Sequence, residues 1–145
     1  MGCSEPKGMP YSLEFRDKGV GALSATTPFE EAKISAALLG FKLSKYTRFE
    51  AGKPKPIYLV QRSSETILEI YPTQDNKYIA RIESRSLHVR TTKDIKLGTL
   101  LQDSKSCQGD EEQLKCPLSK RVFMLYERNI KSEWIATALL WQRHD

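Results

Sequence analysis

Residues 57–71 read IYLVQRSSETILEIY, and this stretch decides the fold. Apolar, aromatic and β-branched side chains fill both ends of it, and Ser63 and Ser64 interrupt them where the chain must reverse. The sequence therefore predicts a strand over 57–62, a turn at 63–65 and a return strand over 66–71. Two strands joined by so short a turn pair in antiparallel fashion.

The segments on either side repeat the pattern of short apolar strands separated by turns. Strands are expected over 78–83, 121–127 and 134–141, and residues 41–43 begin another alternating stretch. Pro54 and Pro56 interrupt that stretch and indicate a loop, since proline cannot donate a ladder hydrogen bond. The pattern is that of an antiparallel sheet rather than of alternating strands and helices.

One helix is expected ahead of these strands, in TTPFEEAKISAALLG at 26–40. Thr27 is placed to cap it, Pro28 to occupy the first helical position, and Gly40 to end it. Phe29, Ala32, Ala36 and Leu39 share one stripe, which Ile34 and Leu38 widen, and we expect this apolar side to face the sheet. The predicted fold class is α+β, with an antiparallel sheet of about six strands and one main helix packed on one face.

The composition is that of one ordinary globular domain with a basic surplus. The chain has 145 residues, of which 28% are charged and 39% hydrophobic, and its net charge is +5. We expect residues 19–145 to form this domain and residues 1–18 to form a lipid-anchor tether that leads into it. A positive charge favours anionic partners, among them lipid headgroups, lipopolysaccharide phosphates, peptidoglycan carboxylates and nucleic acid.

The positive charge is concentrated between residues 42 and 62. Against a single acidic residue, Glu50, this stretch carries six basic residues: Lys42, Lys45, Arg48, Lys53, Lys55 and Arg62. One interpretation is a surface that binds an anionic partner, and the alternative is an ordinary solvated strand-and-loop surface. Tyr46 and Phe49 alternate with the basic residues as on a surface for single-stranded nucleic acid, but the oxidising compartment inferred below argues against that partner.

Cys107 and Cys116 bracket the polar segment CQGDEEQLKC, which has nothing to bury and must lie at the surface. A disulfide across the base of this loop is the expected arrangement, and it places the protein in an oxidising compartment. The alternatives are a metal site and two free thiols. No metal site is expected, because His88 and His144 lie far from these cysteines in the sequence and no further ligand is nearby.

Cys3 is left over and lies where a bacterial lipoprotein would be acylated. Gly2 precedes it, as a small residue usually precedes the modified cysteine, and the Pro- and Gly-rich residues 4–10 are typical of a tether. Myristoylation at Gly2 is a second possibility, disfavoured because Pro6 occupies the position that prefers Ser or Thr. A cysteine without function is the third. We expect lipidation at Cys3.

Four segments together resemble the RpoE-regulated lipoproteins of gamma-proteobacteria, the YfeY-like family. They are GVGALSATTPFEEAKISAALLG at 19–40, DIKLGTLLQD at 94–103, the cysteine loop, and WIATALLWQR at 134–143. The resemblance implies an outer-membrane lipoprotein linked to envelope stress, without an established biochemical role. It implies no catalytic residues and supports both a lipidated Cys3 and the Cys107–Cys116 pair. Ser4 after the anchor cysteine favours the periplasmic face of the outer membrane.

No set of residues in the sequence forms a recognisable catalytic motif, and no cofactor is expected. The favoured function is a non-enzymatic binding or structural module of the envelope, held to the membrane at Cys3 and meeting an anionic envelope component or another envelope protein. The alternative is a secreted inhibitor or enzyme of cell-wall chemistry. Paired carboxylates in a cleft would favour the enzyme, and a rigid loop closed by the disulfide would favour the inhibitor.

Overall fold

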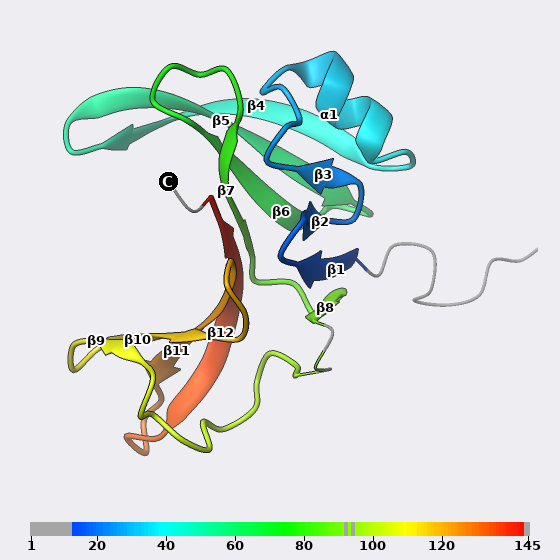
Figure 1. Cartoon of the computed structure of the whole chain (residues 1–145). Helices are drawn as coiled ribbons and strands as arrows, with labels where there is room; N and C mark the ends of the chain where they lie inside the picture. Colours follow the sequence, from blue (N-terminus) through cyan, green and yellow to red (C-terminus); the bar gives the residue numbers. More distant parts are fainter. Residues whose placement is uncertain (1–12, 92, 94, 144–145) are drawn as a thin grey trace, which may run out of the picture.

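The computed structural model describes residues 13–91, 93 and 95–143, and they form two β-sheets with one short helix (Figure 1). The larger sheet has eight strands, in spatial order β4 (Lys42–Glu50), β5 (Lys53–Arg62), β6 (Glu65–Pro72), β7 (Ile79–Ser84), β12 (Trp134–Gln142), β11 (Val122–Arg128), β10 (Gln113–Pro117) and β9 (Gln108–Gly109). The smaller sheet has the order β3 (Leu23–Ser24), β2 (Gly19–Val20), β1 (Leu13–Arg16) and β8 (Val89–Thr91).

The expected α+β class is wrong, because the structure is largely all-β. Its only helix in the described residues is α1 (Glu31–Ala37), seven residues long, and the strands outnumber the six expected. The five strands expected between 57 and 141 are present with ends shifted by at most one residue, except that β5 begins four residues early at Lys53. The missed strands are mostly two to five residues long, too short to show a period of their own.

The loop expected at Pro54 and Pro56 is instead the first half of β5. Both prolines pair with β4, Pro54 with Phe49 and Pro56 with Thr47, whereas pairing with β6 begins only at Tyr58. On its other side this half of β5 is therefore an edge, where a missing N–H costs no ladder bond and discourages pairing with another chain. The β4–β5 hairpin consequently extends beyond the rest of the sheet (Figure 1).

Helix α1 begins later than expected and is not capped by Thr27. Its N-cap is Glu30, without a side-chain cap, while the Thr27 hydroxyl accepts a hydrogen bond from the Ser24 amide at 2.9 Å. Pro28 forms an isolated antiparallel bridge with Tyr78 rather than the first helical turn. The TTPF segment is held by this contact to the β6–β7 turn, and the tertiary pairing overrides the local capping signal.

The buried face of α1 also differs from the expected stripe. Ile34 is fully buried and Leu38 nearly so, whereas Ala32 and Ala36 are exposed and Leu39 is 82% exposed. Phe29 is buried as expected, with its ring centroid 4.8 Å from that of Tyr58 on β5. Ile34 and Leu38 bury more apolar area than Ala32 and Ala36, which favours turning their side of the helix towards the sheet.

Helix α1 and the smaller sheet cover one face of the larger sheet, and the core lies between them. The buried residues of this core include Phe15 from β1, Ile34 from α1, Val60 from β5 and Trp141 from β12. Strand β1 lies within the segment expected as a tether, although residues 1–12 lie outside the described residues. Within the described chain, no helix has the length and apolar character needed to cross a membrane.

The turn between β1 and β2 connects the two sheets through Asp17. Its backbone carbonyl accepts a hydrogen bond from the Trp141 indole at 3.1 Å, and its carboxylate accepts one from the Ser119 hydroxyl at 2.7 Å and one from the Arg121 amide at 2.8 Å. The Ser119 hydrogen bond, followed by that from Arg121, lowers the pKa of Asp17 below its ordinary value.

Candidate functional site

The six basic residues of 42–62 all lie on the β4–β5 hairpin, but they do not form one patch. Lys42 and Lys53 lie at opposite ends of the hairpin, roughly 25 Å apart at the rise of an extended strand. Lys45 points to the face that carries Tyr58, whereas Arg48 and Lys55 pair across the opposite face. Arg62 lies over the Phe41 ring at 5.7 Å, beside α1.

Lys53 and Lys55 both lie at the end of the hairpin that is away from α1. Lys53 and Lys55 leave the Ala51–Gly52 turn on one face of β5, and neither has an ion pair with a described residue. On the facing strand, Tyr46 is 52% exposed on the same face as the two lysines, and Phe49 is 69% exposed on the opposite face. This end of the hairpin therefore carries both free positive charge and exposed aromatic surface.

A cluster of paired charges occupies the face of the larger sheet that α1 does not cover. Arg81 on β7 lies over the Tyr71 ring at 3.9 Å, with its Nε 3.0 Å from Glu83 and its Nη2 3.3 Å from Glu50. Arg48 on β4 donates to both the Tyr71 hydroxyl and Glu69. The cluster crosses four strands and connects the hairpin to the middle of the sheet.

Tyr71 is held in its neutral form at the centre of this charge cluster. Burial is the main cause that raises its pKa to about 12, and the nearby Glu69 adds to the shift. The hydroxyl donates to Glu69 Oε1 at 2.8 Å. The neutral hydroxyl therefore both donates to Glu69 and accepts from Arg48.

Two carboxylates meet in this cluster, which bears on the enzyme alternative. Glu69 and Glu83 are cross-strand partners on β6 and β7. Each is paired with an arginine, Glu69 with Arg48 at 3.3 Å and Glu83 with Arg81. Both carboxylates are engaged by arginine side chains, so the arrangement suits bracing of the sheet better than proton transfer.

Lys115 and Gln142 extend the same face towards β10 and β12. The Lys115 ammonium lies 4.5 Å from the Phe123 ring centroid and donates to Gln142 Oε1. Burial lowers the pKa of Lys115, and the positive charge of Arg81 adds to the effect. Lys115 is thus part of the packed sheet and not a freely exposed surface lysine.

A separate site lies beside the disulfide, where residues 95–106 pack against β10, β11 and β12. This segment, here called the strap, is attached at one side to β12. The Gly98 amide donates to the Ala136 carbonyl at 2.8 Å, the Ala136 amide to Thr99 at 2.9 Å, and the Leu101 amide to Trp134 at 3.0 Å. These bonds satisfy the edge that β12 exposes below its pairing with β7.

The strap is attached at its other side by the disulfide. Cys107 follows it directly and is bonded to Cys116 on β10, with the two Cα atoms 4.2 Å apart. The disulfide expected from the loop spacing is therefore present, and it closes the β9–β10 hairpin as it secures the strap. Backbone pairing and a covalent bond together fix the strap over β10 and β11.

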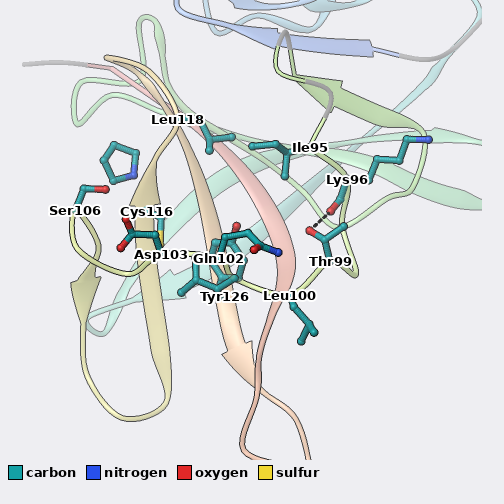
Figure 2. Close-up of a pocket in the computed structure, with 12 residues that line it drawn as sticks. Ile95, Lys96, Thr99, Leu100, Gln102, Asp103, Ser106, Cys116, Leu118 and Tyr126 are labelled. Carbon is teal, nitrogen blue, oxygen red and sulfur yellow. Dashed lines mark hydrogen bonds between the residues drawn. The ribbon is translucent and has the colours of Figure 1, made fainter.

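Beneath the strap is a cavity of about 470 Å³, shown in Figure 2. The strap and the strands β10 and β11 line it, chiefly with apolar side chains: Ile95, Leu100, Leu101, Cys116, Pro117, Leu118 and Tyr126. Asp103 and Ser106 also line it. Its size and lining are those of a small-molecule site.

Tyr126 lies in the wall of this cavity on β11. Burial raises the pKa of its hydroxyl, which makes no hydrogen bond with any residue that the structure describes. A buried phenol usually finds a partner, so this hydroxyl is an uncommitted hydrogen-bonding group in an otherwise apolar wall.

The disulfide should contribute measurably to stability. We expect the double change Cys107→Ala and Cys116→Ala to lower the free energy of unfolding by about 2–3 kcal/mol, because the bond restricts the unfolded chain. Urea denaturation of both proteins measures the difference. An equal loss after adding a reductant to the wild type supports the assignment to the bond, and an unchanged midpoint under reduction contradicts it.

The sequence alone predicts neither the charge cluster nor the cavity. The charge cluster depends on the strand register that places Glu69 opposite Glu83. The cavity depends on the packing of residues 95–106 against strands that come later in the sequence. Cys3 and His144 lie outside the described residues. Among the described residues, no group of three or more His, Cys, Asp or Glu side chains is placed to hold a metal ion.

The fold and the strap define a β-rich two-sheet domain with a small-molecule-sized cavity. The chain belongs to the DUF1131 family, a family of proteins of unknown function, whose model matches residues 7–131. It is similar in fold to the crystal structure of the uncharacterized protein yfeY from Escherichia coli, with a TM-score of 0.72 and 20% sequence identity, over 91% of this chain and 99% of that one. No curated protein matches it.

These comparisons confirm the coarser part of the expected resemblance, which is membership of an uncharacterised family with a yfeY-like fold. An identity of 20% supports the likeness of fold alone. Lipidation, regulation by RpoE and a place in the outer membrane belong to the proposal below.

Proposed function

We propose that this protein is a non-enzymatic binding module of the bacterial envelope that meets an anionic surface through the end of its β4–β5 hairpin. The observation that carries the proposal is the projecting hairpin (Figure 1), which has Lys53, Lys55 and the exposed Tyr46 on one face and the exposed Phe49 on the other. Unpaired lysines attract anionic headgroups, and aromatic side chains favour the interface between water and membrane.

The lipid anchor is the second part of the proposal. Acylation at Cys3 would hold the domain at the periplasmic face of the outer membrane, within an envelope-stress response. A disulfide in the domain fits that oxidising compartment. With the chain already at a bilayer, about 1 kcal/mol per basic residue is enough to orient the hairpin towards it.

The charge cluster supports this assignment by keeping the hairpin in place. Arg48 and Glu50, both on β4, reach Glu69 on β6 and Arg81 on β7. These contacts brace the part of the hairpin that extends beyond the pairing of β5 with β6. A braced hairpin presents its lysines without a large loss of conformational freedom on binding.

Vesicle binding tests the proposal on the full chain carrying Cys3→Ser, which cannot be acylated. We expect binding to vesicles made of equal amounts of phosphatidylglycerol and phosphatidylcholine, and weaker binding as salt rises towards about 0.15 M. Lys53→Glu with Lys55→Glu should weaken binding at least about tenfold, since each reversed lysine contributes about 1 kcal/mol or more. Co-sedimentation with the vesicles measures this.

The matched control reverses two exposed lysines away from the hairpin, Lys33 on α1 and Lys131 between β11 and β12. This pair changes the net charge by the same amount and should leave most of the binding intact. Equal losses in both double variants would mean that net charge alone drives binding. The absence of binding by the wild type at low salt would refute the proposal.

A further inference from the structure

The cavity beneath the strap is a second site, distinct from the hairpin. The residues that line it indicate which class of ligand it would bind. Apolar side chains from two sources converge on it, Leu100 and Leu101 from the strap and Leu118 from the end of β10. Burying hydrocarbon against such walls is favourable in proportion to the area removed from water.

The polar groups at the cavity restrict the charge of its ligand. The Lys96 side chain points away from the cavity in Figure 2, whereas Asp103 lines one end of it. Asp103 makes no ion pair with a described residue, and its carboxylate accepts only the Lys105 amide, at 2.9 Å. An anionic head group would be repelled there, while an uncharged oxygen has the free Tyr126 hydroxyl as a donor.

The cavity is also held open by its attachments. The strap is bonded to β12 on one side and joined to β10 by the disulfide on the other, so the space does not depend on a ligand to form. A site that exists before binding requires little ordering of the protein when the ligand enters.

We propose that this cavity binds one hydrocarbon chain of a small, uncharged amphipathic molecule. The apolar walls contact the chain, the strap forms one side of the site, and Asp103 selects against a negatively charged head. This site needs neither the anchor nor the hairpin, and goes beyond the function proposed above.

A fluorescence assay on the full chain tests the site. The neutral probe N-phenyl-1-naphthylamine should bind with increased emission, and dodecanol should displace it at lower concentration than dodecanoate. We expect roughly a fivefold difference, because one nearby carboxylate opposes the anionic competitor in a partly solvated setting. Asp103→Asn should abolish the difference.

Two variants that fill the cavity decide whether the signal comes from it. Leu118→Trp and Ser106→Trp both place a large ring in the space and should lower probe affinity at least about tenfold, Ser106 being exposed and tolerant of change. Leu39→Trp, at an exposed leucine on the other side of the fold, is the matched control and should bind as the wild type does.

Binding retained in folded Ser106→Trp, or lost equally in Leu39→Trp, would overturn the proposal. Dodecanoate binding as tightly as dodecanol would overturn its selectivity for uncharged molecules. Lys53→Glu with Lys55→Glu should leave probe binding unchanged, so failure of the hairpin proposal and failure of this one are told apart.

Discussion

Replacing Trp141 with alanine should lower the free energy of unfolding by about 3–5 kcal/mol. Trp141 is the largest of the fully buried side chains and packs in the core between the two sheets. The change removes its ring and also the indole hydrogen bond to the Asp17 carbonyl, which connects β12 to the smaller sheet. A cavity of that size cannot close fully because rigid strands surround it.

Trp134→Ala provides the comparison, since Trp134 begins the same strand but is only half-buried, with Arg128 stacked 4.5 Å from its ring. We expect a loss of about 1–2 kcal/mol there, because less apolar area returns to water. Urea denaturation gives both values. Equal losses would show that Trp141 does not have the central role in packing assigned to it.

Gly19→Ala should cost at least about 3 kcal/mol, an exceptional value for so small a change. Gly19 has a φ of +151°, and a Cβ atom added to it would lie 1.8 Å from the Leu23 carbonyl oxygen, closer than any real contact. That oxygen belongs to the β2–β3 pairing, so the backbone of the smaller sheet must move. The side of the core that includes Val20 and Leu23 would then loosen.

Gly52→Ala separates the steric effect from backbone strain. Gly52 also has a positive φ, +80°, but nothing lies within 4 Å of an added Cβ atom. Strain alone predicts a loss of about 1–2 kcal/mol there. Thermal and urea unfolding of both variants measure the difference. A Gly19→Ala protein no less stable than Gly52→Ala would contradict the close approach of β2 and β3.

The principal strands and the disulfide were accessible from the sequence. The 57–71 segment forms β5, a two-residue turn with positive φ at Ser63 and Ser64, and β6. Strand periodicity and turn chemistry are local properties, so they can be interpreted without knowing what packs on them. The cysteine pair needed only a short loop between its members.

The helix shows where local signals fail. Thr27, Pro28 and Glu30 form a good capping pattern, yet Pro28 pairs with Tyr78 and the helix begins at Glu31. A cap contributes about 1 kcal/mol, which packing and pairing in a sheet can exceed. The α+β class was predicted because this local capping signal was taken to indicate a long helix.

The basic stretch shows a second kind of limit. Charge along the sequence identified six residues, but the register of β4 and β5 separates them along two faces, and Arg48 is already paired with Glu69. A strand alternates its side chains between faces, so neighbours in sequence diverge and residues far apart meet.

Composition and local pattern were thus sufficient to identify the principal antiparallel strands, the disulfide-closed loop and the surplus of positive charge. Tertiary structure alone decided that the fold is two sheets, that Glu69 and Glu83 meet beside Arg81, and that the strap forms one side of an open cavity with Tyr126 in its wall. The physical reason is that strands are specified by nearby residues, whereas registers, faces and cavities arise from contacts between distant ones.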